Sequence, residues 1–143
     1  MDNIPRDKMD YKIAFMLALF CGLRRGEICG LNEEDVDTEL CELVVKRTRN
    51  ISKGQVYEDS PKSKSSVRAC AIPQEMAVEI DRLRIFHKEQ QLLLGSRWEQ
   101  SPTLLKNMFG GPMYPATLLD YLKRFCRDNQ LKQTHIHALR HTQ

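Results

Sequence analysis

Two arginines follow a glycine that interrupts an apolar helical segment. In the sequence GLRRGE, residues 22–27, Arg24 stands at the mouth of a helical corner, and Glu27 is spaced to brace its guanidinium. A guanidinium presents five N–H donors in a planar fork that fits two phosphate oxygens. The motif therefore indicates an anion-binding corner. The alternative is a solvated arginine pair beside a glycine that ends a helix.

A second candidate segment is SPKSKSS, residues 60–66, which joins two predicted strands and carries Lys62 and Lys64. A lysine on a hairpin tip can reach into a groove and give a proton to a departing oxygen. Hydroxyl and amide groups in the same loop can contact a phosphate backbone. A hydrophilic hairpin without a site is the simpler interpretation of this segment alone.

The third candidate is HIHALRHT, residues 135–142. His137 and Arg140 are spaced i, i+3 and share one helix face. A histidine that titrates near neutrality beside a permanent cation suits proton transfer at a bound phosphate. His137 and His141 also have the i, i+4 spacing of a zinc pair, but the Glu of the HExxH pattern and an evident third ligand are missing. Structural histidines near a helix start are the other alternative, and no metal is expected.

Three further kinds of chemistry lack their motifs. Asp35, Asp37 and Glu39 alternate as in a calcium loop, without the glycine and terminal Glu that such a loop needs. The sequence contains no GxxxxGK[ST] nucleotide-binding pattern and no paired carboxylates that would indicate a two-metal nuclease. No cofactor is therefore expected.

In their order and spacing, the three motifs closely resemble the tyrosine recombinase (phage integrase) family, over about residues 8–142. The resemblance implies that a tyrosine attacks the scissile DNA phosphate, forms a 3′-phosphotyrosyl bond and releases a 5′-hydroxyl. The bond energy stays in the covalent intermediate and is returned at religation, so the reaction requires neither a metal nor a nucleotide.

The resemblance also implies which residues are catalytic. These are Arg24, Lys62, His137 and Arg140. The two arginines would clamp the non-bridging oxygens, the lysine would be the general acid for the leaving 5′ oxygen, and the histidine would manage the nucleophile's proton. Glu27 would orient Arg24, and His141 would support the pocket. The residue types alone leave open whether Lys62 or Lys64 is the acid, and alignment to the family's loop favours Lys62.

The nucleophile is the point of departure from the family. There the tyrosine lies C-terminal to the His-x-x-Arg motif, whereas this sequence stops at Gln143. The tyrosines that are present precede the motif and match no nucleophile position: Tyr11, Tyr57, Tyr114 and Tyr121. We expect a DNA strand-exchange enzyme in full length and no cleavage by these 143 residues alone. Alternatives are a non-catalytic DNA-binding relative with a regulatory role and, less compatible with the compact motif spacing, a type IB topoisomerase.

The positive charge is concentrated in one stretch. The net charge of +3 comes from 22 basic and 19 acidic residues, but residues 41–73 alone hold seven basic and three acidic side chains. This segment is therefore +4, and the rest of the chain sums to −1, which points to a local anionic partner. The expected partner is double-stranded DNA. The residues predicted to contact it are Arg25, Lys46, Arg47, Arg49, Lys64 and Arg68.

Hydrophobic periodicity predicts the elements that position these residues. Helices are predicted for residues 6–20, 24–31, 74–94 and 115–129, with a last one beginning at residue 138. Strands are predicted for residues 41–47, 55–58 and 67–72, with residues 32–39 as a loop and 50–54 as a turn. The fold class is α+β, mainly helical with a small three-stranded antiparallel sheet. The resemblance implies that the fold is of the tyrosine recombinase catalytic-domain type, incomplete at the C-terminus.

Length and composition set the remaining expectations. A chain of 143 residues with 41% hydrophobic residues has room for one domain, residues 1–143. Its longest apolar run, residues 13–23, is about half of what crosses a bilayer, and there is no signal-peptide pattern. Five cysteines without a CxxC pair indicate free thiols in a reducing cytoplasm. We expect no membrane association, a monomeric fragment, and a full-length tetramer on paired DNA sites.

Overall fold

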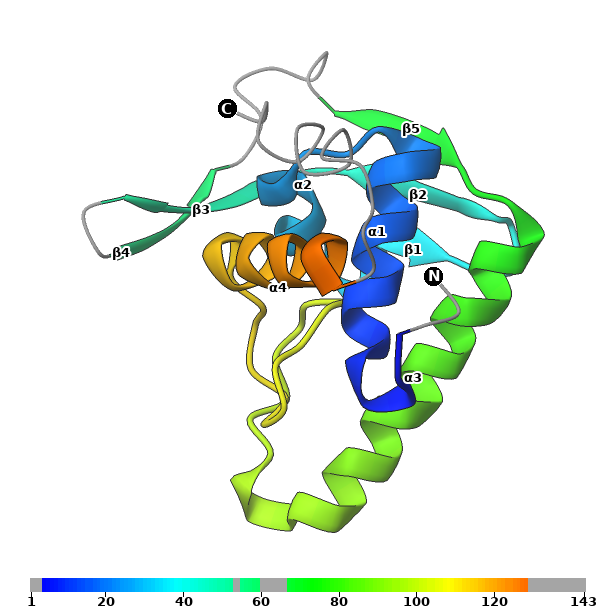
Figure 1. Cartoon of the computed structure of the whole chain (residues 1–143). Helices are drawn as coiled ribbons and strands as arrows, with labels where there is room; N and C mark the ends of the chain where they lie inside the picture. The colour runs from blue at the N-terminus through cyan, green and yellow to red at the C-terminus, as the bar shows by residue number, and fades with distance from the viewer. Residues whose placement is uncertain (1–3, 53–54, 60–66, 129–143) are drawn as a thin grey trace.

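The computed structural model describes residues 4–52, 55–59 and 67–128. Its helices are α1 (Met9–Cys21), α2 (Arg25–Gly30), α3 (Gln74–Leu94) and α4 (Pro115–Asp128). Its strands are β1 (Val36–Asp37), β2 (Glu42–Val45), β3 (Thr48–Ser52), β4 (Gln55–Asp59) and β5 (Arg68–Ala71). Short 3-10 turns cover Arg6–Lys8, Glu33–Asp35 and Gly95–Arg97. Figure 1 shows α1 between the long α3 on one side and α2 with α4 on the other.

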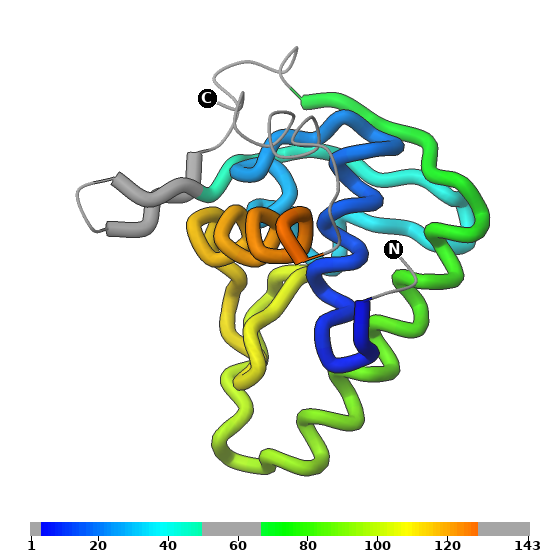
Figure 2. Tube along the Cα trace, viewed as in Figure 1, coloured from blue at the N-terminus to red at the C-terminus, as the bar shows by residue number. Residues whose placement is uncertain are grey.

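Helix α1 is the centre of the fold. Five consecutive side chains are buried along it: Ile13, Ala14, Phe15, Met16 and Leu17. The periodicity predicts one apolar face that includes Phe20, yet 53% of Phe20 is exposed. The reason is that α1 packs against α2, α3 and α4, so its middle is enclosed on several sides while its last turn is not (Figure 2).

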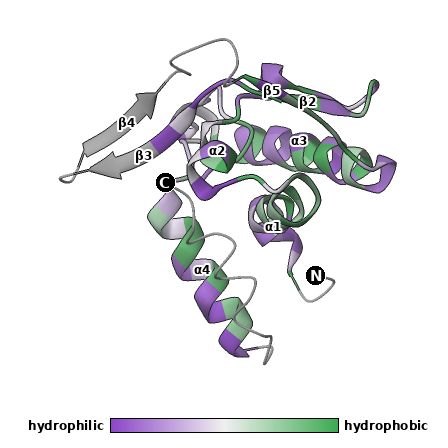
Figure 3. Cartoon of the chain, turned by 90° about the horizontal axis from the view of Figure 1, so that it is seen from above, coloured by the Kyte–Doolittle hydropathy of each residue, from purple (hydrophilic) through white to green (hydrophobic). Residues whose placement is uncertain are grey.

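Helices α3 and α4 match their predictions closely. Helix α3 has the predicted bounds and buries the predicted face, Met76, Ile80, Leu83 and His87. Gly95 ends it with a positive φ of 56°, a conformation that glycine adopts without strain. Helix α4 is described as far as Asp128, with the predicted last residue, 129, outside the described residues, and it buries Leu118, Leu122 and Phe125. Figure 3 shows hydrophobic and hydrophilic residues alternating along α3, as a helix with one buried side requires.

The three-stranded antiparallel sheet is confirmed, but its membership differs from the prediction. Its order is β1-β2-β5, with Leu43 opposite Cys70. Residues 55–58 were expected in this sheet, and they pair instead with β3 in a separate hairpin. Strand β1 lies within residues 32–39, which were predicted as a loop. The sequence does not reveal this strand, because two residues with one buried valine are too short to show a hydrophobic period. The predicted turn 50–54 overlaps β3, since pairing with β4 outweighs the weak strand preference of its polar residues.

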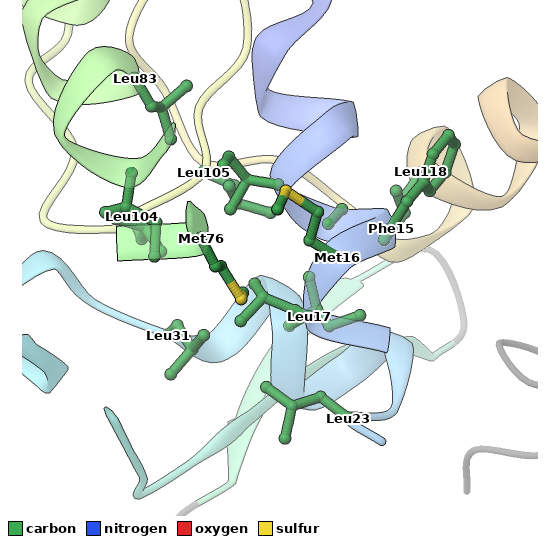
Figure 4. Close-up of a cluster of buried hydrophobic side chains, with 14 of the residues drawn as sticks. Phe15, Met16, Leu17, Leu23, Leu31, Met76, Leu83, Leu104, Leu105 and Leu118 are labelled. Atoms are coloured by element: carbon green, nitrogen blue, oxygen red, sulfur yellow. The ribbon is translucent and has the colours of Figure 1, made fainter. Parts of the chain in front are cut away.

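The core lies where the helices meet the sheet. Figure 4 shows Phe15, Met16 and Leu17 of α1 among side chains from the other helices and from the segment after α3. Leu104 and Leu105, from that segment, are 0% and 1% exposed. Burial of this apolar surface is the main favourable contribution to folding.

A buried polar network fixes the segment between α3 and α4. The Asp10 carboxylate is hydrogen bonded to His87 Nε2 at 2.8 Å and accepts the Lys106 main-chain N–H at 2.8 Å. The Lys106 ammonium donates to the carbonyl oxygens of Ser101 and Thr103. Burial of this ammonium lowers the pKa of Lys106. The network thus ties α1, α3 and the segment between α3 and α4 together.

No helix in the described part of the chain is long and apolar enough to cross a membrane.

Candidate functional site

The corner between α1 and α2 presents Arg24 to solvent. Gly22 ends α1 in the left-handed conformation, with a φ of 63°. Leu23 is 2% exposed and anchors the turn in the core. Arg24 then takes an extended conformation at the N-cap of α2, with an exposed side chain. A glycine that reverses the chain and a leucine that pins it therefore place the arginine predicted at this corner.

Glu27 lies beneath the corner and is 7% exposed. Its Oε1 accepts the main-chain N–H of Arg24 at 3.0 Å. Both carboxylate oxygens also accept from the guanidinium of Arg68, Nη1 to Oε2 at 2.8 Å and Nη2 to Oε1 at 2.9 Å. Glu27 thus fixes the backbone of Arg24 and holds a second arginine, from β5, beside it. The sequence motif predicts the first arrangement but gives no sign of the second.

The C-terminal end of α2 receives two further arginines. Arg47 Nη1 donates to the Gly30 carbonyl at 3.1 Å, and Arg49 Nη1 donates to the Cys29 carbonyl at 3.4 Å. Cations at a helix C-terminus complement its unpaired carbonyl groups. Gly30 permits this approach, because a Cβ there would meet the Arg47 carbonyl oxygen at 2.7 Å. The close contact of α2 with β3 therefore requires glycine at this position.

Asp35 is the second carboxylate of the site, and its side chain is 0% exposed. Its Oδ2 accepts from Arg47 Nη1 at 2.5 Å and from the Asn32 main-chain N–H at 2.8 Å. Lys46 Nζ lies 3.6 Å from its Oδ1. The Asn-x-x-Asp spacing of residues 32–35 is a capping-box signal that could have drawn attention to Asp35.

We name the basic side chains around α2 the α2 basic cluster: Arg24, Arg25, Lys46, Arg47, Arg49 and Arg68. With the carboxylates of Glu27 and Asp35, the group has a formal excess of four positive charges. Its members differ in access to solvent. Arg24 is exposed and Arg25 half-buried, and the side chains of Lys46 and Arg68 are 48% and 47% exposed. Arg47 and Arg49 are directed inward, against the carbonyl groups of α2.

The remaining predicted site residues lie outside the described residues. They are Lys62, Lys64, His137, Arg140 and His141. Of the predicted catalytic set, the structure therefore places Arg24, together with its supporting residue Glu27. Within the described ranges, no group of three His, Cys, Asp or Glu side chains could hold a metal ion.

Two of the tyrosines form a stack rather than a reactive group. The rings of Tyr11 and Tyr121 lie 4.0 Å apart between centroids, at an interplanar angle of 18°. Burial raises the pKa of both phenols. A raised pKa disfavours the phenolate that would act as a nucleophile. Tyr11 and Tyr121 thus join α1 to α4 as packing residues.

Cys21 is the last residue of α1 and lies beside the corner between α1 and α2. Burial, together with a hydrogen bond that the Cys21 thiol donates to the neighbouring Cys70, raises the pKa of Cys21 to about 12. All five cysteines are free thiols. The contact between these two thiols packs the end of α1 against β5, the strand that carries Arg68.

An arginine held at a helical corner inside a basic cluster, on an α+β body, is an arrangement that can bind an anionic group such as phosphate. The model of the phage integrase family matches residues 1–143, and the chain belongs to this family. It is similar to the ICEBs1 integrase of Bacillus subtilis (strain 168), with 28% identity over 139 residues. That match covers 97% of this chain and 38% of the relative.

Another relative is the tyrosine recombinase XerC-like protein of Caldanaerobacter subterraneus subsp. tengcongensis. It is 29% identical over 143 residues, covering 92% of this chain and 37% of the relative. The chain thus spans less than two fifths of the length of these two proteins.

Two solved structures of the Tn1549 transposon integrase share the fold. One is in complex with a circular intermediate DNA and the other with transposon right end DNA. Their TM-scores are 0.71 and 0.70, at 23% identity over 94% of this chain and 45% of theirs. This likeness confirms the fold type predicted from the sequence.

Proposed function

We propose that this chain is part of a site-specific DNA recombinase that integrates a mobile element through a 3′-phosphotyrosyl intermediate. The observation that carries the proposal is the position of Arg24 at the corner between α1 and α2, where its main-chain N–H is hydrogen bonded to Glu27, in a chain of the phage integrase family. The printed descriptions of the relatives, an integrase and a XerC-like recombinase, support it. The DNA bound to the integrases of similar fold supports duplex DNA as the partner.

In this proposal Arg24 binds the scissile phosphate. Its exposed guanidinium donates to a non-bridging oxygen, where negative charge builds up as the phosphorus becomes five-coordinate. Glu27 holds the Arg24 main chain through one hydrogen bond, so the guanidinium starts from a fixed backbone. Less reorganisation is then needed when the transition state forms.

The roles of the other catalytic residues rest on the sequence motifs. Arg140 binds the second non-bridging oxygen, His137 manages the proton of the attacking tyrosine, and His141 supports this pair. As the tyrosine oxygen bonds to phosphorus, the bond from phosphorus to the 5′ oxygen breaks, and Lys62 supplies the proton that makes a 5′-hydroxyl. This chain contributes these side chains, and the tyrosine comes from the remainder of the full-length protein.

Lys64 and the members of the α2 basic cluster other than Arg68 supply the contacts and the positive potential along the DNA backbone. Arg25 and Lys46 are the members outside the corner whose partial exposure best fits direct phosphate contact. Arg47 and Arg49 add to the positive potential of the surface from their positions against α2. Contacts of this kind position the duplex and carry little information about its sequence.

The proposal extends to assembly and location. Residues 1–143 act as one domain, which is monomeric as a separate fragment, and the full-length protein forms a tetramer on paired DNA sites. The enzyme works in the cytoplasm, where its DNA substrate lies and where five free thiols persist.

A suicide DNA substrate, nicked so that religation is impossible, tests the proposal. The full-length protein should accumulate a covalent protein–DNA adduct with a free 5′-hydroxyl. A polypeptide of residues 1–143 should form none, because its four tyrosines all precede the His-x-x-Arg motif and match no nucleophile position. Absence of adduct with the full-length protein, alongside tight DNA binding, would instead establish the non-catalytic relative. An adduct with the fragment would refute the assignment of the nucleophile.

A further inference from the structure

Arg68 is connected to Arg24 through a single carboxylate. Glu27 Oε1 accepts hydrogen bonds both from Arg68 Nη2, at 2.9 Å, and from the Arg24 main-chain N–H, at 3.0 Å. The second oxygen of Glu27 accepts from Arg68 Nη1 at 2.8 Å. The three residues belong to β5, α2 and the corner before α2, so the contacts join separate elements of the fold.

The geometry of the Arg68–Glu27 pair restrains the carboxylate. Two parallel N–H···O bonds fix the carboxylate in the plane of the guanidinium, which a single bond would not do. The Glu27 side chain is 9% exposed, so water has little access to replace a lost donor there. Without Arg68, Glu27 would keep its main-chain contact with Arg24 but would lose the partner that sets its orientation.

We propose that Arg68 is a positioning residue for the reaction, which acts on Arg24 through Glu27 and does not contact the DNA phosphate itself. The inference rests on the proposed function, because it assigns Arg68 to the transition-state contact of Arg24. It departs from the expectation that Arg68 is a phosphate contact. The two nitrogens at the end of the Arg68 guanidinium, Nη1 and Nη2, are both bonded to Glu27, so the end-on fork that could bind a phosphate is occupied.

The two roles predict different losses when Arg68 is removed. A phosphate contact contributes to DNA affinity and to its salt dependence, about −0.9 in the log–log slope for each contact. A positioning residue contributes to the rate of cleavage in the bound complex, while affinity and salt slope stay near their original values. In the full-length protein we expect Arg68→Ala to slow single-turnover cleavage roughly tenfold or more, the range for a hydrogen bond to a charged group. Arg68→Lys, which keeps the charge but not the fork, should recover part of the rate.

A double-mutant cycle tests whether Arg68 acts through Arg24. In an Arg24→Lys background, adding Arg68→Ala should slow cleavage much less than it does in the original protein, since coupled residues are non-additive. The matched control is Arg82→Ala on α3, which also removes an exposed arginine paired to a glutamate. This control should cleave at the original rate.

A second substrate separates positioning from a general loss of structure. A methylphosphonate at the scissile position replaces one charged non-bridging oxygen with a methyl group and so reduces the need for the arginine at that oxygen. The defects of Arg24→Lys and Arg68→Ala should both shrink on it, whereas a folding defect would slow both substrates equally.

The outcomes distinguish the inference from the proposed function. If Arg24→Lys cleaves at the original rate, the assignment of Arg24 fails. If Arg24→Lys is slow but Arg68→Ala cleaves normally, or loses affinity and salt slope instead of rate, the positioning role of Arg68 is refuted. Additive losses in the cycle, or equal losses on both substrates, would also refute it.

Discussion

Replacing Asp35 with alanine removes the buried carboxylate that holds Arg47 against the C-terminal end of α2. The Asp35 side chain is 0% exposed, and its partner Arg47 is 17% exposed. The substitution leaves Arg47 without this partner and the Asn32 main-chain N–H without an acceptor. We therefore expect a specific loss of stability at the base of the α2 basic cluster.

The structure sets the size of this loss. Breaking a buried ion pair by removing one partner costs about 3–5 kcal/mol, and an orphaned buried donor costs about 1–3 kcal/mol. Because Arg47 is partly exposed and can recover some hydration, we expect about 3 kcal/mol in total for Asp35→Ala. Asp35→Asn keeps an acceptor for the main-chain N–H and should lose about half as much.

Urea unfolding of the chain measures this difference. Trp98 is the single tryptophan and is 9% exposed, so its fluorescence reports unfolding. The matched control is Glu34→Ala, an exposed carboxylate next to Asp35, whose stability should change by less than about 0.5 kcal/mol. A loss below about 1 kcal/mol for Asp35→Ala, at an unchanged slope with urea, would show that the Asp35–Arg47 pair does not hold α2 in place.

Three further predictions concern charge and protonation. Burial raises the pKa values of Cys21 and Cys29 to about 12, so at pH 8 both thiols should react with iodoacetamide far more slowly in the folded chain than in the urea-unfolded chain. Mass spectrometry measures the labelling, and equal rates in the two states would contradict the burial of these thiols. Because burial lowers the pKa of Lys106, the unfolded chain binds more protons below the ordinary lysine pKa. The original chain should therefore gain stability relative to Lys106→Met as the pH rises toward that pKa, and a constant difference in urea midpoints would refute the shift. Lys46→Ala should reduce the log–log salt slope of duplex binding by about 0.9, as measured by fluorescence anisotropy. The control is Lys88→Ala on the exposed side of α3, and an equal reduction by this variant would show that the effect is not local to the α2 basic cluster.

The sequence predicts the fold best where periodicity is long. The buried faces of α3 and α4 follow from hydrophobic spacing over several turns, and Gly95 marks the end of α3. The spacing around α1 is less informative, because a helix enclosed by several neighbours has no single apolar face. Strand β1 could not be found, since its two residues are held by pairing with β2 rather than by a pattern of their own.

The candidate site was predictable in part for a similar reason. The corner at Arg24 and the support from Glu27 follow from local spacing, which a sequence displays. The bond between Glu27 and Arg68 joins residues 41 positions apart, and no local pattern records it. The sequence also does not distinguish an arginine that faces solvent from one that is directed inward. Arg49, which is 7% exposed, is directed inward.

The most direct test of the central claim is the rate of covalent adduct formation by the full-length protein. It is measured for the variant Arg24→Ala and for the control Arg82→Ala. The claim is that the corner between α1 and α2 delivers an arginine to the scissile phosphate. We predict that Arg24→Ala slows adduct formation on a suicide substrate about 100-fold or more, with duplex affinity nearly unchanged, while Arg82→Ala forms adduct at the original rate. Adduct formation by Arg24→Ala at the same rate as by Arg82→Ala would contradict the account.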